Sequence, residues 1–314
     1  MFCSVIIPTI GRPSLARAVQ SVLEQVFDEA PFEVIVVNDS GAPLPEAPWQ
    51  ESERVTILHT NRRERSFARN CGAAVGRGKY FYFLDDDDWL LPGALSAFWQ
   101  LAREAPAAAW LHGGVRVMGA DGRILAERNS GVHGSCLAQI MGGAWAPIQS
   151  SIVRAEDFNR VGGYNPFIRG TEDQDLCRRI AVHGALANTP AVVACLFRGD
   201  NWRTSTNYGR AAEDTRRSRD QVVEQPGVFK QLLASAQTGY WRGRVVHVYV
   251  GLARWRLRRR RPLASASALL HGATAMLFSL PHLFQRTFWQ AIRDDHVPGS
   301  LHQIQAAWER EDGR

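Results

Sequence analysis

Residues 80–89 read YFYFLDDDDW, a run of aromatic residues and leucine that ends in four aspartates. An apolar run without alternation indicates a strand that is buried on both faces of a sheet. Residues 3–8 (CSVIIP) and 33–38 (EVIVVN) have the same form, and the second of these runs ends at Asp39. The sequence therefore predicts buried strands, two of which carry acidic side chains at their carboxyl ends.

Helical patterns separate these strands. Residues 15–26 repeat apolar side chains at helical spacing, and residues 66–75 and 92–104 are read as two further helices. The order of strands and helices predicts an α/β fold with a mainly parallel central sheet flanked by helices. In such sheets ligands bind beyond the carboxyl ends of the strands, where Asp39 and the aspartates at 85–88 are expected.

The composition is that of a globular chain. Hydrophobic residues make up 45% of the 314 residues and charged residues 22%, which suits a protein with a sizeable core. The five cysteines include no C-x-x-C pair, so neither a disulfide framework nor a zinc site is expected. The first strand follows Met1 directly and no signal peptide is recognisable, so we expect a cytoplasmic location.

Four adjacent carboxylates at the end of a buried strand repel one another and favour a bound cation. Mg²⁺ suits such a place, because it takes one or two protein carboxylates and completes its shell with water and phosphate oxygens. A solvated acidic turn that precedes the helix at 92–104 is the alternative interpretation.

Several motifs carry a resemblance to a known family. The segments SVIIPT (4–9), VVNDSG (36–41), ARNCG (68–72) and FLDDDD (83–88) closely resemble, in order and spacing, the motifs of family-two glycosyltransferases of the GT-A fold. GGYN (162–165), followed by EDQDL (172–176), is similar to two later motifs of that family. The similarity covers about residues 3–200. It implies an inverting, metal-dependent enzyme that uses a nucleotide-sugar.

The resemblance also implies a domain organisation. We expect a GT-A catalytic domain over residues 1–205, with a nucleotide-sugar binding half (1–105) and an acceptor half (106–205). A basic, mainly helical region follows over residues 206–314.

The resemblance assigns the donor side of the site. Asp39 matches the acid that hydrogen-bonds the base, and Thr9 matches a position in the same pocket. Arg69 and Asn70 match the segment that contacts the nucleotide and the aspartate cluster, although Arg69 could also be an ordinary surface arginine in a region rich in them.

The metal and the base are assigned in the same way. Asp87 matches the direct ligand of Mg²⁺ or Mn²⁺, and Asp85 matches the residue that contacts the ribose or the metal through water. Asp86 and Asp88 are expected to be supporting charges or caps.

Asp173 matches the base that takes the acceptor's proton. Glu172 would orient the loop or contact the acceptor. A swap of these two roles stays open, as does simple acidic capping of the helix that begins at 172.

One departure concerns the metal site. Many GT-A enzymes place a histidine after the last strand, but here residues 198–202 read RGDNW, so Asp200 or Asn201 could substitute, or that ligand is missing. The Q-x-x-R-W segment of processive synthases is also absent, which favours the transfer of one sugar at a time.

The expected donor is a UDP-sugar and the expected acceptor a saccharide or lipid-linked glycan in cell-envelope or polysaccharide synthesis. The alternatives are a sugar nucleotidyltransferase and a non-enzymatic basic protein that binds nucleic acid or membrane. No nucleic-acid-binding motif occurs, so no nucleic-acid partner is expected.

The basic charge lies late in the chain, with 14 basic and four acidic residues between 201 and 261. Residues 240–261 read as a basic amphipathic helix, with Trp241 and Val245 on one face and Arg244 and Arg254 on another. An anionic surface at the inner face of the plasma membrane is therefore a candidate partner. A plain helical subdomain and a membrane span over residues 263–285 are the alternatives.

Overall fold

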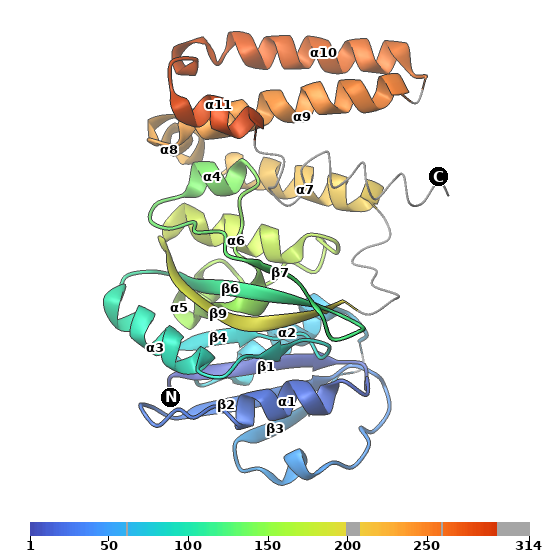
Figure 1. Ribbon diagram of the computed structural model, residues 1–314, viewed down its shortest axis with the longest axis vertical. Helices are drawn as coiled ribbons and strands as arrows, with labels where there is room; N and C mark the ends of the chain where they lie inside the picture. Colours follow the sequence, from blue (N-terminus) through green and yellow to red (C-terminus); the bar gives the residue numbers. More distant parts are fainter. Residues whose placement is uncertain (61, 199–207, 259, 294–314) are drawn as a thin grey trace. The chain divides into compact units, whose positions relative to one another are not determined.

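The computed structural model describes residues 1–60, 62–198, 208–258 and 260–293 (Figure 1). The contacts between its residues divide the chain into two compact units. Unit 1 consists of Met1–Ser135 and Ala146–Thr206, and unit 2 consists of Cys136–Trp145 and Asn207–Arg314. Unit 2 thus takes a short segment from the middle of the chain. The predicted domain boundaries at 105 and 205 stay predictions.

Unit 1 is built on one sheet of nine strands. The strands are β1 (Cys3–Thr9), β2 (Phe32–Asn38), β3 (Val55–His59), β4 (Tyr80–Phe83), β5 (Trp89–Leu90), β6 (Trp110–Gly119), β7 (Ile124–Arg128), β8 (Ser151–Arg154) and β9 (Leu186–Arg198). Their order in the sheet is β3-β2-β1-β4-β8-β6-β9-β5, and β7 pairs with β6 outside this path.

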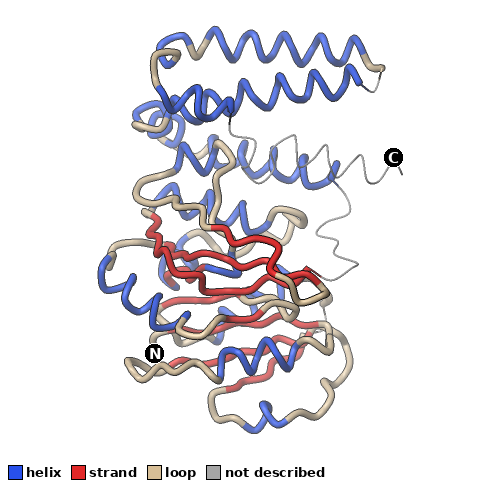
Figure 2. Tube along the Cα trace, viewed as in Figure 1, coloured by secondary structure: helices blue, strands red, loops and turns tan. Residues whose placement is uncertain are grey.

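The predicted α/β class is confirmed, and Figure 2 shows the strands as one layer with helices on either side. The sheet is mixed rather than mainly parallel, because parallel and antiparallel neighbours both occur in it. β3, β2, β1 and β4 run parallel, as the buried apolar runs indicate. β8 runs antiparallel to both of its neighbours, β4 and β6.

Helices cover both faces of this sheet. They are α1 (Leu15–Leu23), α2 (Arg65–Val75), α3 (Ala94–Glu104), α5 (Ala155–Arg160) and α6 (Glu172–His183), with short 3₁₀ turns η1 (Pro48–Glu51) and η2 (Ile148–Ser150). Alternate residues of β1 serve the two faces. Val5 and Ile7 pack in one core with α1 and α3, whereas Ile6 faces Gly72 of α2.

A buried carboxylate ties the start of β4 to β1 and β2. Glu33 Oε1 accepts hydrogen bonds from Ser4 Oγ and from the backbone N–H of Arg77, both at 2.7 Å, and the Arg77 guanidinium Nη2 donates to Glu33 Oε2 at 2.7 Å. Gly78 passes so close that a Cβ there would lie 2.4 Å from the Ser4 nitrogen. Burial opposes ionisation of Glu33, but the hydrogen bonds from Arg77 and Ser4 outweigh it and hold the pKa of Glu33 below its ordinary value.

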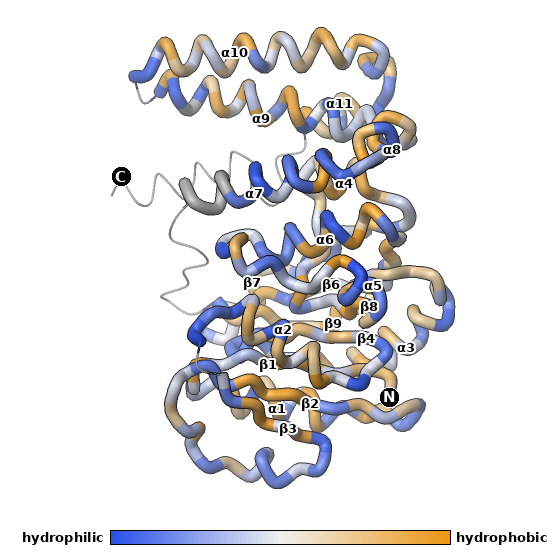
Figure 3. Tube along the Cα trace, turned by 180° about the vertical axis from the view of Figure 1, so that it is seen from behind, coloured by the Kyte–Doolittle hydropathy of each residue, from blue (hydrophilic) through white to orange (hydrophobic). Residues whose placement is uncertain are grey.

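Unit 2 is helical. It contains α4 (Leu137–Met141), α7 (Tyr208–Val223), α8 (Val228–Ala234), α9 (Thr238–Arg258), α10 (Pro262–Leu277), the 3₁₀ turn η3 (Leu280–His282) and α11 (Arg286–Arg293). α4, α10 and α11 all pack against α9. Hydrophobic residues run along α10 (Figure 3). Among the described residues, no helix has both the length and the apolar character that crossing a membrane requires.

The helix predicted over 240–261 exists as α9, but its predicted basic face is wrong at Arg244. This side chain is buried, and it donates from Nε to the Gly142 carbonyl at 3.2 Å and from Nη1 to the Ala291 carbonyl at 3.3 Å. A guanidinium offers several donors, so it can be buried where helix ends supply carbonyls. Helical spacing alone does not distinguish this case from an exposed arginine.

We expect Glu33→Gln to lower the free energy of unfolding by about 2 kcal/mol at neutral pH, because it weakens buried hydrogen bonds to a charged group. Since the folded pKa of Glu33 is depressed, the difference from wild type should be full above the ordinary glutamate pKa of about 4.3 and should vanish as the pH falls through the folded value. Urea unfolding over this pH range measures both effects.

The matched control is Glu156→Gln, which removes an exposed ion pair with Arg160 and should cost less than about 1 kcal/mol. Equal losses for the two variants would contradict the structural role of Glu33.

Candidate active site

The carboxyl ends of β1, β2 and β4 meet at one edge of the sheet. Thr9 pairs with Asn38 in the parallel register of β1 and β2, and the backbone N–H of Asp39 donates to the Thr9 carbonyl at 2.9 Å. β4 lies on the other side of β1 and leads into the aspartates at 85–88. Thr9, Asp39 and the aspartate run, which the sequence predicts as site residues, therefore share this edge.

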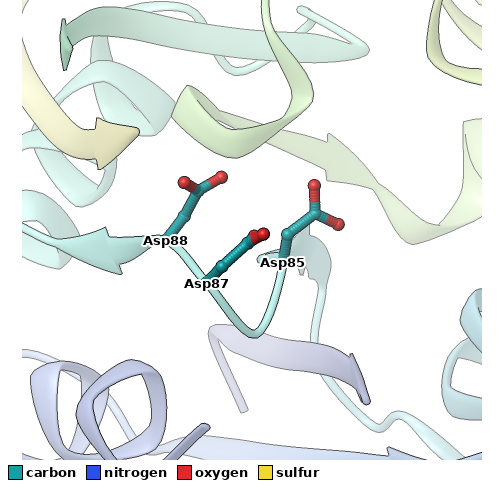
Figure 4. Close-up of side chains that lie close together, drawn as sticks. All are labelled: Asp85, Asp87 and Asp88. Atoms are coloured by element: carbon teal, nitrogen blue, oxygen red, sulfur yellow. The ribbon is translucent and has the colours of Figure 1, made fainter. Parts of the chain in front are cut away.

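The aspartate run separates into two environments. Figure 4 shows the carboxylates of Asp85, Asp87 and Asp88 on one side of the loop, and these three offer oxygens that all lie within 4.8 Å of one another. Asp86 does not belong to this group. It is buried and accepts hydrogen bonds from Thr9 Oγ1 at 2.6 Å and Arg12 Nη1 at 2.7 Å.

The three grouped carboxylates carry an excess of negative charge. Burial, reinforced by the charges of Asp85 and Asp87, raises the pKa of Asp88 well above its ordinary value. Burial and the charge of Asp85 raise the pKa of Asp87 as well, although Arg12 opposes this. Carboxylate oxygens that repel each other in a partly enclosed place are the donor set that hard divalent cations take. The three aspartates therefore fit Mg²⁺ or Mn²⁺.

Arg69 joins this cluster to the start of α6. Its guanidinium is buried on α2 and lies 2.7 Å from Asp85 Oδ1, 3.2 Å from Asp173 Oδ1 and 3.4 Å from Glu172 Oε1. The pKa of Asp85 is thereby held below its ordinary value: burial works against this, but the positive charges of Arg69 and Arg65 outweigh it. One buried cation thus holds three carboxylates from two distant parts of the sequence.

Asp173 has an unusual acidity for an aspartate. Burial raises the pKa of Asp173 to about 7, with Arg69 opposing the shift and the charges of Glu172 and Asp85 adding to it. A carboxyl group that titrates near neutrality can accept and release a proton at physiological pH. The side chain of Glu172 is more buried than that of Asp173, and it forms ion pairs with both Arg69 and Arg65.

Asn70 has a structural role that the sequence did not predict. Its Nδ2 donates to the Tyr164 carbonyl and its Oδ1 accepts from the Tyr164 N–H, both at 2.9 Å. Gly163 adopts a φ of 69°, and a Cβ there would lie 2.7 Å from Asn70 Oδ1. Asn70 therefore holds the glycine turn that leads toward α6, and nucleotide contact by Asn70 stays a prediction.

Asp39 is buried at the same edge. Burial raises the pKa of Asp39 above its ordinary value, and the positive charge of Arg63 opposes the shift. Asp200 and Asn201, the residues named as substitutes for the missing histidine, lie outside the described residues.

Two neighbours of the cluster were not predicted. Arg12 bridges Asp86 and, at 3.1 Å, Asp87, and Gln149 Nε2 donates to Asp85 Oδ2 at 2.9 Å. The place of Arg12 directly after the first strand was a signal that sequence reasoning could have used. Gln149 enters from η2, before an antiparallel strand, and no sequence pattern marks it.

Comparisons with known proteins find glycosyltransferases. The model of the family described as Glycosyl transferase family 2 matches residues 4–159. An uncharacterized glycosyltransferase of Haemophilus influenzae is 24% identical over 240 residues, which cover 72% of this chain and 80% of the relative.

Two shorter similarities are to proteins whose names state a reaction. The poly(ribitol-phosphate) beta-N-acetylglucosaminyltransferase TarP of Staphylococcus aureus is 32% identical over 32% of this chain, and the GalNAc(5)-diNAcBac-PP-undecaprenol beta-1,3-glucosyltransferase of Campylobacter jejuni is 34% identical over 33% of it. The matched segment spans about a third of each relative, 33% and 35% of their lengths.

Among solved structures, S. aureus TarS 1–349 in complex with UDP-GlcNAc superposes with a TM-score of 0.59. The match covers 85% of this chain and 90% of that one at 14% identity. At this identity the similarity shows a common fold.

We expect Arg69→Met to lower the free energy of unfolding by about 3 to 5 kcal/mol, because it leaves carboxylates buried without their counter-charge. The loss should be largest above about pH 7, where Asp173 is also ionised, and should shrink as acid protonates the carboxylates. Urea unfolding at several pH values measures it.

Arg65→Met is the matched control on the same helix. Arg65 is 62% exposed in its pair with Glu172, so its loss should cost less than about 1 kcal/mol. An Arg69→Met loss as small as this, or one independent of pH, would show that Arg69 does not hold the carboxylates.

Proposed function

The chain belongs to glycosyl transferase family 2 and is a glycosyltransferase of the GT-A fold. From its site we propose that it transfers one sugar from a nucleoside-diphosphate sugar to an acceptor hydroxyl, with inversion at the anomeric carbon. The observation that carries this proposal is the link through Arg69. It brings a carboxyl group with a pKa of about 7, Asp173, next to the cluster of Asp85, Asp87 and Asp88.

The donor side would be formed by the sheet edge. Asp85 and Asp87, with Asp88 beside them, would hold Mg²⁺ or Mn²⁺. A cation held by these carboxylates would supply positive charge for the departing nucleoside diphosphate. Asp39 and Thr9 would line the nucleobase end of the same edge, and Asp85 would approach the ribose or the ion's water shell.

The acceptor side would be formed by the start of α6. As the acceptor oxygen forms its bond to the anomeric carbon and the bond to the diphosphate breaks, the hydroxyl proton passes to the Asp173 carboxylate. Glu172, fixed by Arg65 and Arg69, would orient this segment. A carboxylate held by a buried arginine keeps one position through the reaction, which favours an in-line attack.

The names of the relatives support a class of donor and a class of acceptor. The TarS structure contains UDP-GlcNAc, which supports a UDP-sugar as donor. The C. jejuni relative is named for an undecaprenol-diphosphate-linked glycan and TarP for poly(ribitol-phosphate), which supports a lipid-linked or polymeric saccharide acceptor in cell-envelope synthesis. Thermal-shift screening of nucleoside diphosphates with and without Mn²⁺ tests the donor directly. No stabilisation by any of them would overturn the proposal.

We expect Asp87→Ala to abolish metal-dependent transfer while the fold stays intact, because it removes the most accessible carboxylate of the cluster. Calorimetric titration with Mn²⁺ should show weaker binding, and the unfolding temperature should be nearly unchanged. Asp121→Ala is the control. It removes an exposed ion pair with Arg123 in the turn between β6 and β7, and it should behave as wild type. Retention of wild-type metal-dependent transfer by Asp87→Ala would remove the metal assignment.

Asp173→Asn should bind the donor normally but transfer about 10²- to 10⁴-fold more slowly, since it cannot accept a proton. For the wild type, the raised pKa means that the carboxyl is protonated below about pH 7, so kcat/KM should fall there by about tenfold per pH unit and reach a plateau above it. Donor titration and a pH profile measure these effects.

Glu172→Gln separates the two acids at the start of α6. It should retain more transfer than Asp173→Asn. If instead Glu172→Gln is the inactive variant, the base is Glu172.

A further inference from the structure

The helix α10 is packed with its small residues inward. Ser265, Ala268 and Gly272 are buried, Ser265 Oγ donates to the Ala253 carbonyl of α9 at 2.8 Å, and a Cβ on Gly272 would lie 3.3 Å from Tyr249 Cβ. A helix of a water-soluble domain normally buries its large apolar side chains and exposes the polar ones. α10 instead buries small side chains and exposes its leucines, and polar residues such as Ser267 and His271 are exposed beside them.

The large apolar side chains of this part of unit 2 lie on its outside. Leu263, Leu270 and Leu277 recur at seven-residue intervals and are 87%, 68% and 62% exposed, and Phe284 after η3 is 97% exposed. We call the following residues the outer surface: Leu263, Leu269, Leu270, Leu277, Phe278, Leu280 and Phe284. Several exposed leucines and phenylalanines within one helix and the segment after it are typical of an interaction site.

The charges around the outer surface have one sign. Arg254, Arg260 and Arg261 are exposed at the end of α9 and in the turn that leads into α10. Figure 3 shows hydrophilic residues at this connection between the two helices. Between residues 225 and 293 the sequence has 11 basic and no acidic residues. Whatever covers the outer surface must therefore be apolar and must tolerate, or supply, negative charge at its rim.

From this combination we infer that the outer surface and the arginines at its end dock unit 2 onto an anionic phospholipid bilayer. Leucines and phenylalanines would enter the boundary between headgroups and acyl chains, and the arginines would contact lipid phosphates. α10 has 16 residues, about 24 Å of helix, so it suits a position in the plane of the interface rather than across the ~30 Å hydrocarbon core. The docking face is thus α10 and the segment after it. It is not the apolar face predicted for α9, because Trp241 and Val245 on that face are half-buried.

A second copy of the chain fits this surface less well. It would bring another strongly basic face against the first, with no carboxylates from residues 225–293 to pair with the arginines. An anionic lipid surface supplies the missing charge.

Flotation of the full chain with phosphatidylcholine vesicles, with and without phosphatidylglycerol, tests the inference. No donor or acceptor is present, so the result does not depend on the proposed reaction. Wild type should bind the anionic vesicles at low salt and bind the neutral ones at least tenfold more weakly. Leu270→Ser combined with Phe284→Ser should reduce binding by more than tenfold, and Arg254→Gln combined with Arg261→Gln by about tenfold.

The control is Val26→Ser combined with Leu125→Ser, which removes two exposed apolar side chains of unit 1 and should leave vesicle binding unchanged. Circular dichroism should show that every variant keeps its helix content, because all the changed side chains are exposed. Equal binding to neutral and anionic vesicles, or no effect of the Leu270 and Phe284 changes, would overturn the inference. Self-association of wild type that Leu270→Ser and Phe284→Ser abolish would assign the surface to a second copy instead.

Discussion

The site depends on one buried guanidinium. Arg69 contacts Asp85 at the end of β4 and Glu172 and Asp173 at the start of α6, so a single positive charge holds together carboxylates that would otherwise repel each other. The arrangement is asymmetric. The pKa of Asp85 is lowered, whereas that of Asp173 is raised to about 7, because burial dominates at the second group. Two aspartates with the same partner are thereby suited to different tasks, one to remain charged and one to exchange a proton.

Four consecutive aspartates likewise have separate surroundings. Asp86 is committed to Thr9 and Arg12, Asp88 accepts from the Phe197 backbone N–H at 2.9 Å, and Asp87 is the most open to solvent of the four. A tight turn after a strand points successive side chains in different directions, so sequence adjacency does not imply a common role. The excess negative charge is concentrated on Asp85, Asp87 and Asp88, whose carboxylate oxygens lie within 4.8 Å of one another.

Much of this could be read from the sequence. The apolar runs before Asp39 and Asp85 predicted the parallel strands, and the parallel arrangement explains why these residues share an edge. The antiparallel entry of β8 was not predictable, because a short buried strand has the same composition in either direction. Gln149 and the inward course of Arg244 were missed because their partners are a distant carboxylate and two backbone carbonyls, which leave no periodic signal.

Arg69 and Asn70 are adjacent on α2, yet one fixes the charges at the start of α6 and the other fixes the backbone of the glycine turn before it. One turn of helix therefore connects the end of β4 with the segment that runs from the glycine turn to the start of α6. Chimeras that exchange sequence between this enzyme and its relatives would need α2 and residues 162–175 from the same parent. Loops that contact neither α2 nor residues 162–175 are free of this constraint and can vary independently.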